Sequence, residues 1–308
     1  MSLRADPFIQ DAATGRSVTV WWAAIIVFLG LFAFQLAVMT ALAVAWPGPD
    51  GSPAAQVQEA VANLLTIGLL FTWIAWFERR RIATLGLRRP GRGLLVLLLG
   101  VAVGLAMISV PILFLWATGS YQTAPAPQDA TAGAAALPLV VALTATVIAQ
   151  GANEELLTRG FLFQSFAQGL PGWLAIGLGA VIFALVHGVV EPLPFATITL
   201  YALFATFTAL ALRSLWLVCG IHAGWNFGMG NVYGIPVSGS DPQTASLVFL
   251  APAPGSADWL TGGDFGTEGG LPAALTLLAA TAIACTRWQR QRRAAAAGDT
   301  PAAAPTMH

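Results

Sequence analysis

The sequence predicts an all-α protein, a polytopic bundle of about eight transmembrane helices. Of its 308 residues, 57% are hydrophobic and only 9% are charged, a balance too apolar for a water-soluble globule of this length. The hydrophobic residues fall into eight runs separated by turns rich in glycine, proline and arginine. We therefore expect one transmembrane domain at 20–286, between an N-terminal tail at 1–19 and a basic, disordered tail at 287–308.

The predicted spans follow one another with short connections and one long exception. The first run is longer than the roughly 7 to 15 apolar residues of a signal-peptide core, so we expect it to remain as a helix. Residues 234–270 are expected to form an irregular extramembrane loop, with a short interfacial piece at 246–251. The predicted spans are residues 20–46, 57–77, 93–117, 137–168, 173–189, 195–212, 215–233 and 271–286.

The arginines indicate the orientation of the bundle. The chain has no lysine. If its N-terminus is cytoplasmic, the segments on the inner side of the membrane contain the arginines of 79–92, 213 and 287–293. The outer connections contain none, as the positive-inside rule expects; they are residues 47–56, 118–136, 190–194 and 234–270. We predict an integral protein of a bacterial inner (plasma) membrane with both termini in the cytoplasm. The lack of a basic stripe argues against nucleic acid as a partner.

Two adjacent carboxylates, Glu154 and Glu155, and the cation of Arg159 interrupt the fourth predicted span. On insertion scales, each charged side chain at the centre of a membrane costs roughly 2.5 to 3.5 kcal/mol. Such groups need partners or a water-filled cavity, so an intramembrane site is the default hypothesis. Apart from the last residue of the chain, His187 and His222 are the only histidines. Each lies in a later span, and we expect both to converge on the carboxylates.

The spacing of the polar residues indicates which of them share a helix face. Three pairs are four positions apart and so lie on common faces: Glu155 and Arg159, Phe183 and His187, and His222 and Asn226. Glu154 points about 100° away from Glu155, because a helix has 3.6 residues per turn. We assign Glu155 to an ion pair with Arg159 and Glu154 to a cavity. Glu155, Arg159 and Phe183 are expected to support the site.

The depths of these residues in the membrane are expected to differ. Counted from the turn at 169–172, Glu154 and His187 both lie roughly 24 to 26 Å along their helices and are therefore level. His222 lies only about 12 Å past the turn that precedes its span. The difference is resolved if residues 159–173 form a hairpin that projects into the cytoplasm.

A carboxylate, two imidazoles and an amide in a watery pocket suit hydrolysis. Glu154 would act as general base on a water molecule, and His187 would orient that water or bind a metal. His222 and Asn226 would donate hydrogen bonds to the oxyanion of an amide under attack. A divalent metal such as zinc, held by Glu154, His187 and His222, is an alternative. No His-Glu-x-x-His helix is present to establish it.

The order of these motifs resembles a known family. Glu154-Glu155-x-x-x-Arg159, Phe183-x-x-x-His187 and His222-x-x-x-Asn226, on successive apolar segments within 137–233, are similar to the three motifs of the CPBP intramembrane proteases. That family includes the type II CAAX prenyl endopeptidases and bacterial Abi proteins, some linked to bacteriocin self-immunity. The resemblance implies an endopeptidase with about eight helices, a cytoplasm-facing cavity, and a glutamic or metal-dependent site. It does not imply a prenylated substrate.

The leading hypothesis is an endopeptidase acting in the bilayer on a peptide or membrane-associated protein near the cytoplasmic leaflet. The alternative is a non-catalytic scaffold or bacteriocin self-immunity protein, in which the polar side chains only join helices by hydrogen bonds. A proton-relaying transporter is less favoured, since no matching Gly/Pro-interrupted segments occur in the two halves of the chain. Cys219 and Cys285 lie in apolar runs, so we expect neither a disulfide nor a cysteine metal site.

Overall fold

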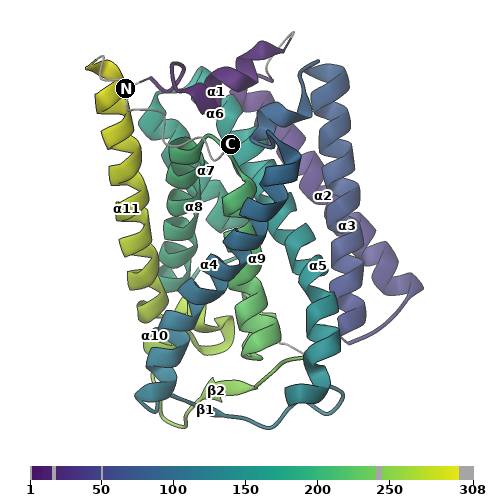
Figure 1. Ribbon diagram of the computed structural model, residues 1–308. Coiled ribbons are helices and arrows are strands. Elements are labelled where there is room, and N and C mark those ends of the chain that lie inside the picture. Colours follow the sequence, from purple (N-terminus) through teal and green to yellow (C-terminus); the bar gives the residue numbers. More distant parts are fainter. Residues whose placement is uncertain (1, 16–18, 50, 241–244, 298–308) are drawn as a thin grey trace.

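The computed structural model describes residues 2–15, 19–49, 51–240 and 245–297. Six segments of this part of the chain are long and apolar enough to cross a membrane. A shorter apolar helix, Gly172–Val186, and a further helical segment at 216–232 accompany them, and the predicted all-α polytopic bundle is confirmed (Figure 1). The eight segments are α2 (Trp21–Ala45); α3 (Pro53–Thr72) with η2 (Trp73–Phe77); α4 (Pro90–Ala117); α5 (Leu137–Glu155) with η5 (Leu156–Leu162) and α6 (Phe163–Gly169); α7 (Gly172–Val186); α8 (Pro192–Leu212); α9 (Trp216–Phe227) with η6 (Gly228–Val232); and α11 (Leu271–Ala296).

Prolines mark the points where several helices begin. Pro53, Pro90 and Pro192 are the first residues of α3, α4 and α8. A proline there loses no helical hydrogen bond, and its fixed φ angle suits the first turn. Ser52 caps α3, because its hydroxyl accepts the N–H of Ala55 at 3.2 Å. These local signals set the starts of the helices before any tertiary packing forms.

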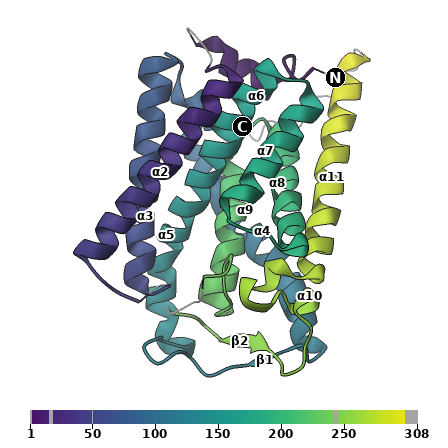
Figure 2. The same cartoon turned by 180° about the vertical axis from the view of Figure 1, so that it is seen from behind.

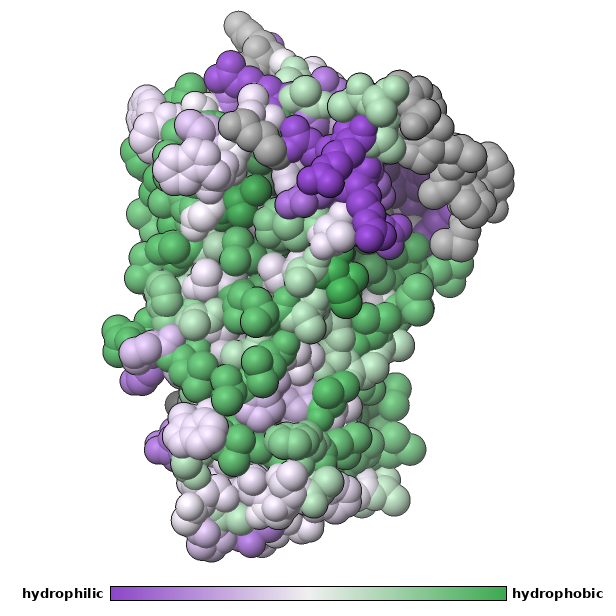
Figure 3. Space-filling view, turned by 90° about the vertical axis from the view of Figure 1, so that its left-hand side faces the viewer, coloured by the Kyte–Doolittle hydropathy of each residue, from purple (hydrophilic) through white to green (hydrophobic). Residues whose placement is uncertain are grey.

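On the face seen in Figure 3, apolar side chains form a belt between two more polar ends. Large apolar side chains are exposed on several helices, including Ile26 on α2 (63%), Leu95 on α4 (68%) and Ile283 on α11 (71%). Apolar surface on this scale is stable against lipid hydrocarbon rather than water. The protein is therefore an integral membrane protein.

The two ends of the bundle are built differently (Figures 1 and 2). The arginine-rich end contains the short helices near the N-terminus, the connection between α3 and α4, and the segment α6. The loop end contains a two-stranded sheet and α10. The additional short elements are α1 (Pro7–Gln10), η1 (Asp11–Thr14), η3 (Ile82–Leu85), β1 (Tyr121–Thr123), η4 (Gly133–Ala136), β2 (Leu250–Pro252), α10 (Asp258–Thr261), η7 (Gly263–Phe265) and η8 (Thr267–Gly269).

The N-terminal segment covers α6 at the arginine-rich end, so the hairpin expected to project into the cytoplasm is buried up to residue 167, and only its tip, including Trp173, is exposed. Gln164 is fully buried, and its Nε2 donates to the carbonyl oxygens of Phe8 at 3.2 Å and Thr84 at 2.9 Å. The Nη1 group of Arg80 donates to Gln164 Oε1 at 2.9 Å. Phe8 is itself 0% exposed. The first residues, expected to form only a tail, therefore close this end of the bundle.

Helix α9 begins below the surface of the protein, which explains the depth of its polar residues. Leu215, immediately before the helix, is 0% exposed and donates its N–H to Gly86 O at 3.0 Å. The indole of Trp216 donates to Arg88 O at 2.9 Å. Residues of the α3–α4 connection thus hold the start of α9 in the interior. His222 consequently lies deeper than its position in the sequence predicts.

Glycines allow α4 and α9 to pack backbone against backbone. A Cβ atom on Gly220 of α9 would lie 2.0 Å from the carbonyl oxygen of Leu97, and one on Gly104 of α4 would lie 2.1 Å from that of Ile221. Gly224 makes the same approach to Val101 O. Small residues four apart are the usual means by which membrane helices approach this closely. We call this contact the glycine seam.

The long loop at the end opposite the arginines has a definite structure in its described part. Strands β1 and β2 pair antiparallel, with Tyr121 opposite Pro252. The hydroxyl of Tyr121 donates to Thr261 O at 2.8 Å and lies 2.9 Å from Thr267 Oγ1. Burial raises the pKa of Tyr121 to about 12, so the hydroxyl keeps the proton it donates. The segment predicted to be irregular is therefore anchored to the rest of the bundle.

The basic segment after the last span, predicted as part of a disordered tail, continues α11 as helix to Ala296. Trp288 is 4% exposed, and its Nε1 donates to Asp6 Oδ2 at 3.0 Å. This contact explains the extension, because it packs the helix against the N-terminal segment. The remainder of the predicted tail, 298–308, lies outside the described residues.

Candidate active site

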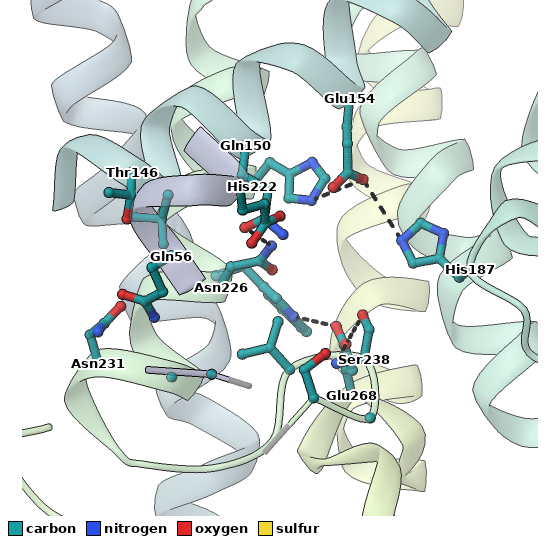
Figure 4. Close-up of a pocket in the computed structure, with 18 of the residues that line it drawn as sticks. Gln56, Thr146, Gln150, Glu154, His187, His222, Asn226, Asn231, Ser238 and Glu268 are labelled. Atoms are coloured by element: carbon teal, nitrogen blue, oxygen red, sulfur yellow. Dashed lines mark hydrogen bonds and ion pairs between the residues drawn. The ribbon is translucent and has the colours of Figure 1, made fainter. Parts of the chain in front are cut away.

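The residues singled out in the sequence converge on one carboxylate. Glu154 Oε2 lies 3.7 Å from Nε2 of His187 and 3.7 Å from Nε2 of His222 (Figure 4). Glu154 lies near the end of α5, His187 directly follows α7, and His222 lies in α9. The exposed fraction of the Glu154 side chain is 24%. Three separate helices therefore bring their polar groups to a point that is open to solvent.

Hydrogen bonds fix the orientation of both imidazole rings. Nδ1 of His187 lies 2.7 Å from Phe183 O, and a carbonyl can only accept, so Nδ1 carries the proton. Nδ1 of His222 lies 3.0 Å from Glu155 Oε1 and likewise donates. In the neutral rings, both Nε2 lone pairs then face Glu154. The contact with Phe183 also shows how the pair four residues apart orients the ring, whose centroid lies 4.6 Å from that of Phe183.

Glu155 lies in a dry network behind the histidines. Its side chain is 0% exposed, and its Oε1 accepts from Arg159 Nη1 at 3.1 Å and from Tyr201 OH at 3.2 Å, besides His222. The guanidinium of Arg159 lies 4.2 Å from the ring centroid of Phe183. A buried charge requires such partners, because it loses its hydration on burial. The predicted ion pair is thus present, and it extends to a histidine and a tyrosine.

Helix α5 presents a second polar row toward the cavity. Thr146, Gln150 and Glu154 are four residues apart, and all three line the same cavity. Gln150 Oε1 accepts from Nδ2 of Asn226 at 3.1 Å. An amide Nδ2 carries two hydrogens, so the second hydrogen of Asn226 remains for another acceptor. The pair from α9, His222 and Asn226, therefore faces the polar row of α5.

The cavity that contains Glu154 has a volume of about 580 Å³, within the range of roughly 300 to 1,000 Å³ for ligand pockets. Its lining includes Gly51 from the α2–α3 connection, Ser240 from the long loop and Glu268 from η8. These residues belong to connections at the loop end, which has no arginine. The resemblance implied a cavity facing the arginine-rich side. The structure instead places its mouth at the opposite end, because α6 and the N-terminal segment fill the expected side.

A smaller apolar cavity of about 150 Å³ reaches the same site from the side of α2. It shares Glu154, Phe183 and His187 with the larger cavity and is otherwise lined mainly by apolar residues such as Phe28 and Phe32. Glu154 therefore lies where a wet chamber and a narrow apolar space meet.

Four residues of the site were not found from the sequence. Tyr201 on α8 and Gln150 on α5 hold site residues, and Glu59 on α3 and Glu268 on η8 line the cavity. The four-residue spacing from Gln150 to Glu154 was a usable signal. The other three lie in separate elements, and no local pattern connects them with the motifs.

The fit of a metal can be judged from the donor atoms. Two histidine Nε2 atoms and a carboxylate are donor types that zinc uses. Among the described residues, however, no group of three or more His, Cys, Asp or Glu is arranged so that it could hold a metal ion. The separations of 3.7 Å around Glu154 are longer than a direct hydrogen bond, so the carboxylate and both Nε2 atoms stay available to one shared water molecule. We therefore derive the chemistry from this chain's own residues, and the metal stays a prediction.

Comparisons with known proteins agree with the motifs. Residues 136–228 match the family described as type II CAAX prenyl endopeptidase Rce1-like. This range runs from the start of α5 through α9 and contains all three motifs. No curated protein and no solved structure matches the chain. The family match confirms the resemblance to the CPBP intramembrane proteases over the segment that carries their motifs, and it indicates a membrane protease.

Proposed function

We propose that the protein is an intramembrane endopeptidase that hydrolyses a peptide bond in a peptide or membrane-associated protein. The observation that carries this proposal is the position of Glu154, whose Oε2 lies 3.7 Å from two histidine Nε2 atoms in a solvent-accessible cavity. A carboxylate beside two oriented imidazoles can activate water and manage the protons of amide hydrolysis. The substrate and the lipid bilayer are the partners that this activity requires.

The first step is the attack of water on the peptide carbonyl. Glu154 takes one proton of the water molecule. The other hydrogen of the water is donated to the Nε2 lone pair of His187. The oxygen forms a bond to the carbonyl carbon, and the carbonyl oxygen becomes an oxyanion. His187 suits the orienting role because its Nδ1 is committed to a neutral carbonyl, that of Phe183, at 2.7 Å.

The oxyanion then needs hydrogen-bond donors. Asn226 offers the Nδ2 hydrogen that Gln150 does not take. His222 serves as the second donor when its Nε2 is protonated, and the carboxylate of Glu155 at its Nδ1 stabilises that imidazolium. Collapse of the intermediate breaks the C–N bond, and Glu154 returns its proton to the leaving amine. The water has then been divided between the two products, and the site is regenerated.

The buried network positions these groups without touching the substrate. Arg159 and Tyr201 hold Glu155, and Glu155 fixes the ring of His222. In the alternative of a non-catalytic scaffold, each polar group would join helices. Glu155 does so, but Glu154 makes only two contacts of 3.7 Å and faces the cavity. This difference favours the enzyme.

The test is cleavage of an internally quenched peptide mixture by the purified protein in detergent. We expect turnover by the unaltered chain and a loss of about 10²- to 10⁴-fold in Glu154→Gln, the contribution typical of general acid–base catalysis. Glu191→Gln is the matched control, since this exposed glutamate lies outside the cavity. Equal cleavage by Glu154→Gln would remove Glu154 from the mechanism. Metal analysis and chelator treatment of the same sample decide between the glutamic and the metal-dependent reaction.

A further inference from the structure

The arginines give the bundle a polarity. Among the described residues, every arginine except Arg159, which lies within the site, belongs to a segment at the arginine-rich end. The described residues of the connections at the loop end include no arginine, but they include five acidic residues: Asp129, Glu191, Asp258, Asp264 and Glu268. Arginine is retained on the cytoplasmic side of a membrane, whereas acidic residues have little influence on orientation. The arginine-rich end therefore faces the cytoplasm, and the loop end faces away from it.

The route from Glu154 to the arginine-rich end is blocked. All residues from 156 to 167 are buried. Beyond them, Gln168 Nε2 donates to Ile9 O at 2.7 Å, and Arg4 Nε donates to Gln168 O at 2.7 Å. Two cavities at that end are lined by residues of 81–92, and neither contains a residue of the site. The N-terminal segment and α6 thus form a plug between the site and the cytoplasm.

The route to the other end is open. The cavity of Glu154 continues past Asn226 to residues 238–240 and to Glu268, all of which belong to the loop end or border it. Ser240 lines this cavity and is exposed to solvent. Glu268 fixes this wall, because its carboxylate accepts from Trp225 Nε1 at 3.0 Å and from Ser238 N–H at 2.8 Å. The wall at this end of the cavity is therefore held in place by hydrogen bonds that join α9, η8 and the long loop.

Resting on the proposed endopeptidase function, we propose that the substrate enters from the extracytoplasmic side, so that the cleaved bond lies in a polypeptide segment outside the cytoplasm. The cavity lining matches a positively charged segment. It includes the carboxylates of Glu154 and Glu268, while no arginine is among the described residues that line it. Negative charge in a low-dielectric cleft raises the local concentration of cationic chains.

The first experiment measures which side the mouth faces, independently of catalysis. In a Cys285→Ala background, in which the remaining Cys219 is buried, Ser240→Cys reports on the mouth and Ala13→Cys on the arginine-rich end, where it is exposed in η1. Sealed spheroplasts are treated with a membrane-impermeant maleimide. We expect Ser240→Cys to react at once and Ala13→Cys to react only after permeabilisation. The reverse pattern would overturn the inference.

The second experiment measures cleavage from that side. A membrane-impermeant, lysine-rich quenched peptide mixture is added to sealed spheroplasts that express the unaltered chain or Glu154→Gln. We expect cleavage outside the cells that is lost in the variant. Cleavage in detergent without cleavage by sealed spheroplasts would refute entry from outside and leave the proposed function intact. Failure in detergent as well would count against the proposed function, and the maleimide pattern would still decide the side of access.

Discussion

Glu154 and Glu155 are adjacent in the chain, yet their surroundings have little in common. The Glu154 side chain is 24% exposed and faces two histidines across 3.7 Å. The Glu155 side chain is 0% exposed and accepts hydrogen bonds from an arginine, a tyrosine and a histidine within 3.2 Å. One step of about 100° around the helix separates a wet carboxylate from a dry one.

This difference suits the two adjacent carboxylates to different roles, Glu154 to proton transfer and Glu155 to holding other side chains in place. A carboxylate that takes and returns a proton needs water and room, whereas a carboxylate that holds a ring in place needs fixed donors. His222 connects the two, with Nδ1 on Glu155 and Nε2 toward Glu154. The comparison predicts that replacements on the dry side change stability first, and those on the wet side change rate first.

The largest effect is expected for Arg159→Ala. Removing the guanidinium leaves Glu155 buried without its cation, which typically costs about 3 to 5 kcal/mol. Denaturant-induced unfolding of the purified protein in detergent measures this loss. The double replacement Glu155→Leu with Arg159→Met removes both charges and should recover part of the stability while activity stays low, because His222 has lost its carboxylate. Recovery of both stability and activity would contradict the supporting role of Glu155.

Asn226→Ala tests the part of the site that faces the cavity with Glu154. Loss of one oxyanion donor is expected to lower kcat by about 10²- to 10³-fold, with KM and the unfolding midpoint nearly unchanged. Gln150→Ala is the matched control, because it removes the partner of Asn226 but not the donor itself. We expect the fold-decrease in kcat of Gln150→Ala to be less than about a tenth of the fold-decrease in Asn226→Ala. A drop in stability with unchanged kcat would instead place Asn226 among the residues that only join helices.

Tyr201→Phe is expected to have the smallest effect. It removes one of three hydrogen bonds to Glu155 Oε1 while keeping the aromatic ring, whose centroid lies 4.9 Å from that of His222. The free energy of unfolding should fall by about 1.5 to 3 kcal/mol, the range for a hydrogen bond to a charged group, and kcat should change only a few fold. A loss of activity as large as that of Asn226→Ala would show that the hydroxyl acts on the substrate.

Local helix geometry made much of the site predictable. The spacing of Glu155 and Arg159 predicted their pairing, and the structure places the two groups 3.1 Å apart. The same rule placed His222 and Asn226 on one face, and both line the cavity. The catalytic roles of these residues remain predictions, since geometry alone does not measure a rate.

Tertiary contacts account for what the sequence did not predict. The depth of His222 depends on Leu215, which a carbonyl of the α3–α4 connection holds in the interior. The direction of the cavity depends on the N-terminal segment, whose Phe8 covers α6. Tyr201 reaches Glu155 from 46 residues away in the chain. Neither periodicity nor composition encodes contacts over such separations, because they form only when the helices pack.

The glycine seam has a consequence for how the enzyme could be modified. Because α9 lies flush against α4, with Gly220 and Gly224 facing carbonyl oxygens, that helix can neither rotate nor slide without a steric clash. The side chains of His222 and Asn226 are thus carried by a helix whose position is fixed by backbone contacts with α4. Changes in substrate range are more readily accommodated on the wall formed by α3, where the side chains of Ala55, Gln56 and Glu59 line the cavity.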